Sequence, residues 1–231
     1  MQPAAEPTGA RTLLLVRHGL PDYRYRGRAD ELPGPPLSEI GRRQALQAAT
    51  FLARYDVQTV YSSPLSRALQ TARCIAERLN VPLHVESELA EWHRTESLFG
   101  VSQRSACWLG RWLRGNESCA AIVGHASPLL AILRTALYLP HVGWHHPGQP
   151  QRLQLDSADR FELSMACVVE LTIQDRWVGA EPVFHPQPRI LDAQHRPVRY
   201  SLPVPVVGGR ESTRLIRPNL LRLTGCQPRS G

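Results

Sequence analysis

The sequence predicts a three-layer α/β fold, in which helices flank a mostly parallel central sheet. Three short apolar runs, at residues 12–17, 57–61 and 120–124, have the length and composition of buried strands. A segment with helical spacing of its apolar residues follows each run, and this alternation is typical of parallel sheets. The 231 residues, 42% hydrophobic and 20% charged, are enough to bury a core without disulfide or metal support.

Two helices are expected after the first and second of these strands. Ser38 is a good N-cap, and apolar residues recur at helical spacing from there to about Tyr55. Pro64 suits the first turn of the second helix, which reaches Leu79 with one apolar face. Both helices therefore present a face that can cover the sheet.

Shorter elements complete the predicted fold. A short strand is predicted at residues 82–85, a helix around 108–113 and another helix at 128–139. Residues 165–173 and 176–184 are predicted to form a hairpin at an edge of the sheet. The second half of the chain thus adds helices and an edge to the same domain.

The chain is expected to divide near residue 185. Residues 1–185 are predicted to form one domain, whereas residues 186–231 are rich in proline and arginine and predict an extended C-terminal arm. The arm has eight arginines against two acids, so it carries +6 of the net charge of +7. No RNA-binding motif accompanies these arginines, so nucleic acid is not an expected partner. The arm is expected to be solvated or to embrace a second subunit in a homodimer.

Composition excludes several kinds of chemistry. Lysine is absent, so all 27 basic residues are arginines. An anion must therefore be bound by arginine, histidine or backbone amides, and lysine nucleophiles are excluded. Five scattered cysteines predict reduced thiols. Since no signal-peptide pattern or apolar run of membrane-spanning length occurs, the protein is expected to be cytoplasmic and to have no membrane partner.

Polar residues follow each of the three predicted strands. Arg17 and His18 come at the end of the first strand, Arg67 follows the second, and His125 follows the third. The carboxyl ends of parallel strands form the crevice where ligands bind, so these side chains are expected to converge. Two guanidiniums match the oxygens of a phosphoryl group in pairs, and a neutral histidine between them can act as a nucleophile.

These residues belong to four motifs in a fixed order: LVRHG at 15–19, PLSEIGRRQA at 36–45, YSSPLSRALQTA at 61–72 and IVGH at 122–125. In their order and spacing, which cover about residues 12–139, the chain resembles the histidine phosphatase superfamily, also called phosphoglycerate mutase-like proteins. The resemblance implies a metal-independent, histidine acid phosphatase-like phosphatase that needs no cofactor. Its substrate would be a small phosphorylated metabolite, hydrolysed through a phosphohistidine intermediate.

The resemblance also assigns roles by position. His18 would be phosphorylated on a ring nitrogen, while Arg17, Arg67 and His125 would bind the phosphoryl group and stabilise charge in the transition state. Glu91, in a match to the family's L-x-E block, would protonate the leaving group as general acid.

Some features of the family pattern leave alternatives open. Relatives often carry a glycine four residues after the acid, where this chain has Thr95, so Glu88 and Glu96 are alternative acids. Only 34 positions separate Glu91 from His125, whereas mutases usually carry a longer insertion there, and this favours hydrolysis. The alternative functions are a phosphomutase, a protein phosphatase acting on phosphohistidine or phosphotyrosine, and a non-catalytic phospho-ligand binding protein.

Two further groups of residues bear on substrate and metal. The loop after the first strand has side chains that could clamp an anionic or ring-bearing substrate: Tyr23, Arg24, Tyr25, Arg26 and Arg28. The substrate is expected to be chosen by residues 20–36 and 92–104, where the resemblance is weakest. Three later histidines lack a carboxylate or cysteine to complete a metal site, so they are expected to be loop residues and no metal is expected: His141, His145 and His146.

Overall fold

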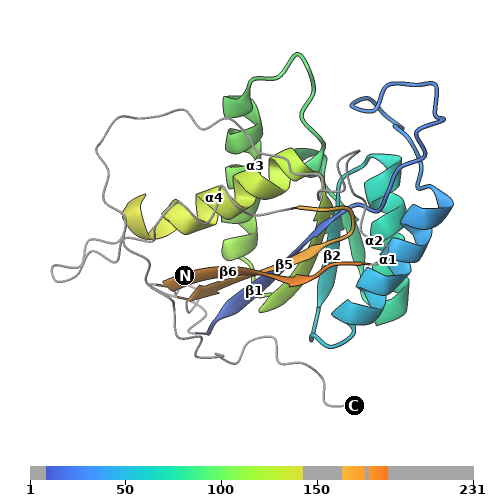
Figure 1. Cartoon of the computed structure of the whole chain (residues 1–231). Helices are drawn as coiled ribbons and strands as arrows, with labels where there is room; N and C mark the ends of the chain where they lie inside the picture. Colours follow the sequence, from blue (N-terminus) through green and yellow to red (C-terminus); the bar gives the residue numbers. More distant parts are fainter. Residues whose placement is uncertain (1–8, 143–162, 175–176, 187–231) are drawn as a thin grey trace, which may run out of the picture.

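The computed structural model describes residues 9–142, 163–174 and 177–186, and Figure 1 shows them as a sheet with helices on both faces. The strands are β1 (Arg11–Arg17), β2 (Thr59–Ser62), β3 (Leu83–Val85), β4 (Cys119–Gly124), β5 (Val168–Gln174) and β6 (Trp177–Phe184). The helices are α1 (Glu39–Leu52), α2 (Ser66–Leu79), α3 (Leu98–Leu113), α4 (Ala126–Val142) and the short 3-10 helix η1 (Ser87–Leu89). The predicted α/β class is confirmed.

The described strands form one mixed sheet in the order β3-β2-β4-β1-β5-β6. The first four strands of the chain pair in parallel, with Leu15 of β1 opposite Ile122 of β4. β5 runs antiparallel to β1, and β6 runs antiparallel to β5, so the predicted edge hairpin is confirmed. Because β2, β4 and β1 are parallel neighbours, their carboxyl ends meet at the same edge of the sheet.

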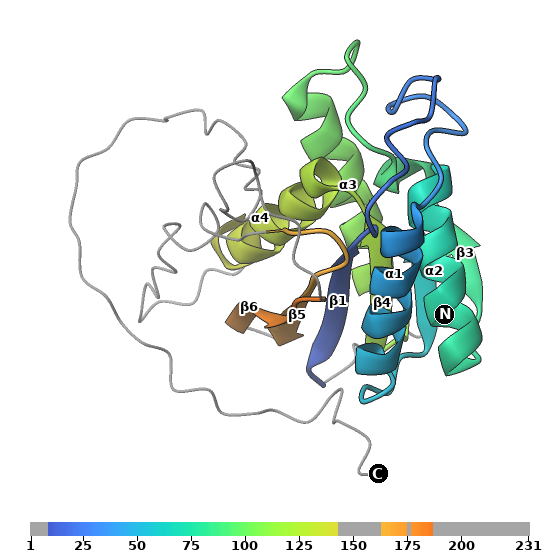
Figure 2. The ribbon, with the colours of Figure 1, turned by 45° about the vertical axis from the view of Figure 1, so that its right-hand side comes forward.

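The side chains of β1 alternate between the two faces of the sheet. Leu13 and Leu15 are fully buried in a core that includes residues of α3 and α4. Leu14 and Val16 are fully buried in a second core that includes residues of α1 and α2. Figure 2 shows these two helix pairs on opposite sides of the strands. The continuous apolar run of β1 is thus explained, because a strand covered on both faces has no solvated side.

The first two helices begin almost where the sequence predicts. The Ser38 hydroxyl accepts a hydrogen bond from the backbone N–H of Gly41 at 3.0 Å, which confirms it as the N-cap of α1. α2 starts at Ser66, two residues later than predicted, and no side chain caps it. Instead, the backbone N–H of Ser66 donates to the carbonyl of Pro33 at 2.8 Å, so the loop before α1 supplies this bond.

α3 is longer than the sequence pattern indicates. It starts at Leu98, because the Ser97 hydroxyl accepts a hydrogen bond from the N–H of Gly100 at 3.0 Å. Its first turns carry few buried apolar residues, so helical spacing becomes visible only near Trp108. The prediction therefore missed the amino-terminal half of this helix.

The turn after β1 packs directly against the start of α1. A Cβ atom added to Gly19 would collide with the carbonyl of Gly41, and one added to Gly41 would collide with the carbonyl of Leu20. The same Leu20 carbonyl accepts the backbone N–H of Ser38 at 2.9 Å. Two glycines are therefore required here, because a close approach of two backbones leaves no room for side chains.

Three cysteines agree with the prediction of reduced thiols. Cys74, Cys107 and Cys167 have free thiols. No helix among the described residues is long and apolar enough to span a membrane. His141 lies within α4, which continues to Val142, so the prediction of a loop is wrong for this residue. The predicted C-terminal arm, with its expected role in a homodimer, and His145 and His146 lie outside the described residues.

Candidate active site

The predicted site residues meet where β1, β2 and β4 end. Arg17 and His18 come from the end of β1, Arg67 from the first turn of α2, and His125 lies between β4 and α4. Their side chains are buried, with residue exposures of 4%, 3%, 4% and 0% in that order. The loops that follow β1 and η1 project from this same end of the sheet (Figure 1). The four side chains therefore form one buried cluster at this end of the sheet, which we call the pocket.

The hydrogen bonds of His18 fix its tautomer. Nδ1 lies 2.7 Å from the carbonyl oxygen of Gly19, which can only accept, so Nδ1 carries the ring proton. Nε2 accepts the Nε–H of Arg67 at 3.1 Å, so the lone pair of this nitrogen faces the guanidinium. Gly19 is itself held by the Thr71 hydroxyl, which accepts its backbone N–H at 3.1 Å. The imidazole is thus oriented with Nε2 as its nucleophilic atom.

Burial and two positive neighbours keep His18 neutral. Desolvation lowers the pKa of His18 well below 6.5, and the charges of Arg67 and Arg17 lower it further. The hydrogen bond to Gly19 acts in the opposite direction and is the weaker influence. A neutral imidazole has a free lone pair at any pH near 7, as nucleophilic attack requires.

His125 lies beside His18 and faces a carboxylate. The two ring centroids are 5.0 Å apart, with the planes tilted by 58°. Nε2 of His125 shares a 2.8 Å hydrogen bond with the Ser63 hydroxyl, and Nδ1 is 3.9 Å from Oε2 of Glu91. Among the described residues, Nδ1 has no hydrogen-bond partner. Burial lowers the pKa of His125 well below 6.5, with the positive side chains of the pocket adding to the effect.

The two guanidiniums are held by backbone carbonyls. Nη1 of Arg17 donates to the Leu163 carbonyl at 2.5 Å, and Nη1 of Arg67 donates to the Ala29 carbonyl at 2.8 Å. Burial lowers the pKa of Arg67, while the nearby charge of Glu91 raises it. With both imidazoles neutral, two buried positive charges face one carboxylate. This excess of positive charge and of N–H donors favours an anion with several oxygens, such as a phosphoryl group.

The three candidate acids lie in different surroundings. Glu91 approaches His125, and its side chain is 24% exposed. Glu88 is ion-paired with Arg111, and this hydrogen bond lowers its pKa below 4.5. Glu96 is ion-paired with Arg104 at 2.8 Å, with the same effect on its pKa. A carboxyl held ionised by an arginine is a poor proton donor, so the geometry favours Glu91 among the three.

Three residues that the sequence analysis did not single out also shape the pocket. The first is Ser63, which bonds to His125 and lies in the same motif as Arg67. The second is Thr71, one helical turn beyond Arg67, which fixes the backbone of Gly19. The third is Arg104, which donates to the carbonyls of Glu88 and Glu91 as well as to Glu96. Thr71 could have been found from sequence, because it lies one helical turn after Arg67 on the same face of the predicted helix. Arg104 could not, because it lies in the part of α3 that the sequence pattern did not predict.

The predicted loop arginines do not enter the pocket. Arg24 is ion-paired with Asp22 at 2.9 Å, and its side chain is 90% exposed. Arg28 is ion-paired with Asp30 at 2.8 Å. Arg26 is exposed on the same loop. A role for these three arginines in substrate binding stays a prediction, and the acids of the loop already balance two of them.

Low pH should destabilise the protein through the two pocket histidines. Because the folded state lowers the pKa of His18 and of His125, the unfolded chain binds more protons below about pH 6.5. We expect the free energy of unfolding to fall between pH 7 and pH 5 by up to about 1 kcal/mol per pH unit for each histidine. Urea denaturation across this range measures the slope.

A matched pair of variants checks this assignment. His18→Asn should reduce the slope of stability against pH by about half, whereas His84→Asn, at an exposed position in β3, should leave it unchanged. Equal slopes in both variants would contradict the assignment to His18.

The chain matches known proteins over this region. Residues 13–97 match the family model described as the histidine phosphatase superfamily, branch 1. This stretch includes Arg17, His18, Arg67 and Glu91. Over these residues the chain is similar to the histidine phosphatase superfamily.

Two curated relatives of this chain are named as phosphatases. Glucosyl-3-phosphoglycerate phosphatase of Mycolicibacterium vanbaalenii is 30% identical over 170 residues, which are 74% of this chain and 64% of the relative. The protein of the same name from Mycobacterium tuberculosis is 38% identical over 84 residues, 36% of this chain and 38% of the relative. The chain thus aligns with less than two thirds of the length of these relatives.

Several solved structures share the fold of this chain. A mycobacterial glucosyl-3-phosphoglycerate phosphatase superposes with a TM-score of 0.55 at 23% identity, over 71% of this chain and 90% of that one. A phosphoglycerate mutase from Bacillus anthracis superposes with a TM-score of 0.59 at 17% identity, over 76% and 93%. At these identities the likeness is one of fold, and phosphatases and mutases are both represented.

Proposed function

We propose that the protein hydrolyses phosphomonoesters through a phosphohistidine formed on Nε2 of His18. The observation that carries the proposal is the hydrogen bonding of this ring: Nδ1 is the donor, and Nε2 directs a lone pair toward buried guanidiniums. The names of the curated relatives support phosphatase chemistry. The substrate would be a small phosphorylated metabolite.

In the first step, Nε2 of His18 attacks phosphorus while the bond to the ester oxygen breaks. An incoming phosphoryl group accepts the Nε–H of Arg67 in place of the imidazole, and this exchange exposes the Nε2 lone pair. Arg17 and Arg67 then stabilise the charge that spreads over the phosphoryl oxygens. Glu91 gives a proton to the leaving oxygen, so the alcohol departs neutral.

In the second step, water attacks the phosphorus atom. The carboxylate of Glu91 accepts the proton of this water, and the electrons of the N–P bond return to His18. The hydrogen bond from Nδ1 to the Gly19 carbonyl holds the ring and disperses its positive charge while it carries phosphate. The cycle therefore needs no group beyond these side chains and water.

His125 is proposed to bind phosphate as a neutral donor. The Ser63 hydroxyl already accepts the backbone N–H of Leu65 at 3.3 Å, so its own proton can go to Nε2 of His125. This arrangement places the ring proton of His125 on Nδ1, which faces the side of Glu91. Because this donor is neutral, it can add a hydrogen bond to phosphate without a charge that would change the pKa of His18.

Trapping the intermediate tests the function. After brief incubation with a 32P-labelled phosphomonoester and acid-free quenching, we expect label on the protein that is stable to base and labile to acid. His18→Ala should carry no label. Label that survives acid would contradict a phosphohistidine. Turnover without any trapped label, in rapid-quench experiments, would favour direct attack by water.

Two alternatives have distinct outcomes. A curated relative from Thermoplasma acidophilum is named a 2,3-bisphosphoglycerate-dependent phosphoglycerate mutase and is 38% identical over 79 residues. A phosphomutase would transfer the trapped phosphate to a second position on a sugar acid rather than to water, and isotope exchange would reveal this. A non-catalytic phospho-ligand binding protein would bind phosphate without forming the labelled species.

Replacing the proposed acid should affect esters unequally. Glu91→Gln removes the proton donor, so kcat/KM for an alkyl phosphate, which reports the first step alone, should fall by about 100-fold. The kcat/KM for p-nitrophenyl phosphate should fall by less than about tenfold, because p-nitrophenolate leaves without protonation. Glu88→Gln is the matched control, because the Glu88 carboxylate is already paired with Arg111. This variant should lower kcat/KM only slightly, and to the same extent for both esters. An equal loss on both esters in Glu91→Gln would exclude Glu91 as the acid.

A further inference from the structure

Exposed apolar side chains gather on the two segments that project from the site end of the sheet. Among the described residues, seven large hydrophobic side chains are exposed, and five of them lie on the loop after β1 or on the segment from the end of η1 into α3. We call these five the apolar rim: Tyr23, Leu32, Trp92, Leu98 and Phe99, with exposures of 74%, 68%, 41%, 37% and 75%. Exposed apolar surface that gathers beside a site indicates a binding surface.

The two segments of the apolar rim touch each other. Nε2 of His93 lies 3.8 Å from a carboxylate oxygen of Asp30 and 3.8 Å from one of Glu31. The backbone N–H of Arg94 also donates to the Asp30 carboxylate. Figure 2 shows both loops rising from the same end of the sheet. The two segments that carry the rim are therefore in contact with each other.

The acids of these loops are balanced by arginines. Asp22 pairs with Arg24, and Asp30 pairs with Arg28. Glu31 also pairs with Arg28, at 2.6 Å. Ion pairs closed within the loop leave little net charge for a second anionic group of the substrate. The surface therefore favours an uncharged, apolar leaving group beyond the phosphate.

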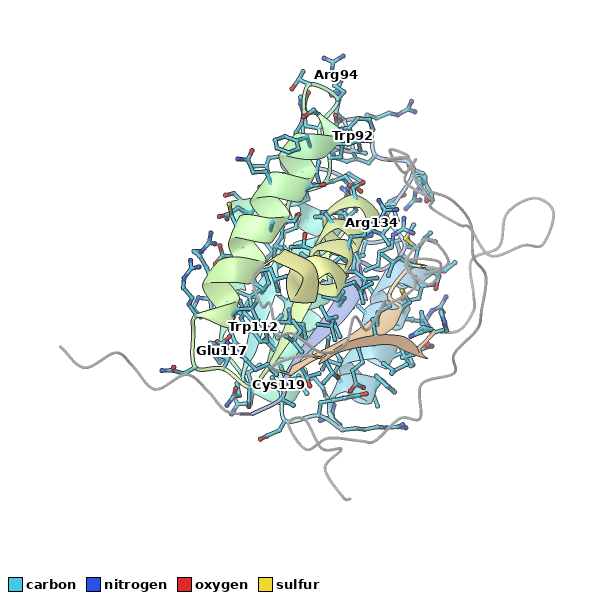
Figure 3. The ribbon with its side chains drawn as sticks, turned by 90° about the vertical axis from the view of Figure 1, so that its left-hand side faces the viewer. Trp92, Arg94, Trp112, Glu117, Cys119 and Arg134 are labelled. Carbon is cyan, nitrogen blue, oxygen red and sulfur yellow. The ribbon has the colours of Figure 1, made fainter. Side chains whose placement is uncertain are left out.

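Trp92 is held in a fixed orientation beside the proposed acid. Its backbone N–H donates to Oε1 of Glu91 at 2.9 Å, and its indole Nε1–H donates to the Glu96 carbonyl at 2.6 Å. Figure 3 shows Trp92 at the upper end of α3, while Arg94 points outward from the tip of the loop. A fixed indole next to the group that protonates the leaving oxygen can stack on the first atoms of the leaving group at little cost in entropy.

Tyr23 lies on the opposite loop, the one that follows β1. Its hydroxyl acts electrostatically to raise the pKa of Arg67. A leaving group held between Arg67 and Glu91 would therefore be flanked by the loop that carries Tyr23 and by the segment that carries Trp92. Two aromatic side chains along one exit path offer flat surfaces to a flat ligand.

We propose that the substrate of this site is a phosphomonoester whose alcohol carries a planar aromatic ring close to the ester oxygen, bound by Trp92 and Tyr23. This inference rests on the proposed phosphatase function and narrows its substrate class. Aromatic stacking adds free energy beyond that of burying the same area, so a flat ring should be preferred to a saturated ring of similar size.

A matched pair of substrates isolates the contribution of the ring. Benzyl phosphate and cyclohexylmethyl phosphate release alcohols of similar acidity and size, so they make equal demands on the chemical step. We expect kcat/KM to be about tenfold higher for benzyl phosphate. Equal values for the two esters would overturn the inference and leave the phosphatase function intact. If the protein hydrolyses none of the three esters (benzyl phosphate, cyclohexylmethyl phosphate and p-nitrophenyl phosphate), the proposed function itself is overturned.

Variants then place the preference on the apolar rim. Trp92→Phe should keep the preference for benzyl phosphate, whereas Trp92→Leu, which keeps apolar area but no ring, should reduce the ratio to about one or two. Leu46→Ala, at an exposed apolar position on α1, is the control and should keep the wild-type ratio. If Trp92→Leu does not fold by circular dichroism, Tyr23→Leu at a 74% exposed site provides the same test. A ratio unchanged in the folded leucine variant would overturn the inference.

Discussion

His18→Ala should reduce kcat for p-nitrophenyl phosphate by about 1,000-fold or more, because it removes the nitrogen that we propose attacks phosphorus. An activated ester is the most demanding choice of substrate here, since its leaving group needs no acid. The loss must therefore come from the nucleophile. Steady-state kinetics with purified protein measure the effect.

The control for this prediction is a histidine outside the pocket. His84→Ala changes an exposed side chain of β3 and should leave kcat within about twofold of wild type. Binding of inorganic phosphate, measured by calorimetry, should persist in His18→Ala because Arg17 and Arg67 remain. A His18→Ala protein with more than about one tenth of the wild-type rate would refute the phosphohistidine route.

Arg67→Ala should lower kcat/KM by about 100-fold to 1,000-fold. The guanidinium is the donor to Nε2 of His18 and is buried to 4% exposure, so its charge acts at short range without screening by water. Arg67→Lys should recover only part of the loss, because an ammonium lacks the forked donors that match two phosphoryl oxygens. The inhibition constant of orthovanadate or phosphate should rise in parallel.

The same variant should shift the pH profile. The positive charge of Arg67 lowers the pKa of His18, so its removal raises that pKa toward 6.5. Protonated His18 cannot attack phosphorus, and the acid limb of kcat/KM against pH should therefore move to higher pH. Arg73→Ala, at an exposed position on the same helix, should alter neither the rate nor the profile. An identical acid limb in Arg67→Ala and wild type would contradict the electrostatic role.

Much of the fold could be predicted because its strands are apolar on both faces. The runs that became β1, β2 and β4 have no solvated side, so their positions were clear, and Ser38 marked the start of α1 by its capping chemistry. The start of α3 could not be found in this way. Its first two turns bury only Val101 and Ser105, and helical spacing is lost where apolar side chains face solvent, as Leu98 and Phe99 do.

The site residues on strand ends were predictable for a similar reason. A histidine or arginine directly after a buried strand has a defined place at the edge of the sheet, and His18 and His125 lie there. The choice among Glu88, Glu91 and Glu96 could not be made from sequence, because it depends on pairing with arginines of α3 that are distant along the chain. Long-range partners of exposed side chains leave no local pattern.

The paired glycines at the base of the loop after β1 fix where this loop starts. The backbones of Gly19 and Gly41 approach each other closely, and the N–H of Asp22 donates to the Pro36 carbonyl at 2.8 Å just beyond them. The interior of the loop supports the site as well, because the Ala29 carbonyl accepts a hydrogen bond from Arg67 and the Pro33 carbonyl accepts the N–H of Ser66. A graft that replaces this loop should therefore change the choice of alcohol without disturbing the imidazole only if it keeps these two carbonyls in place.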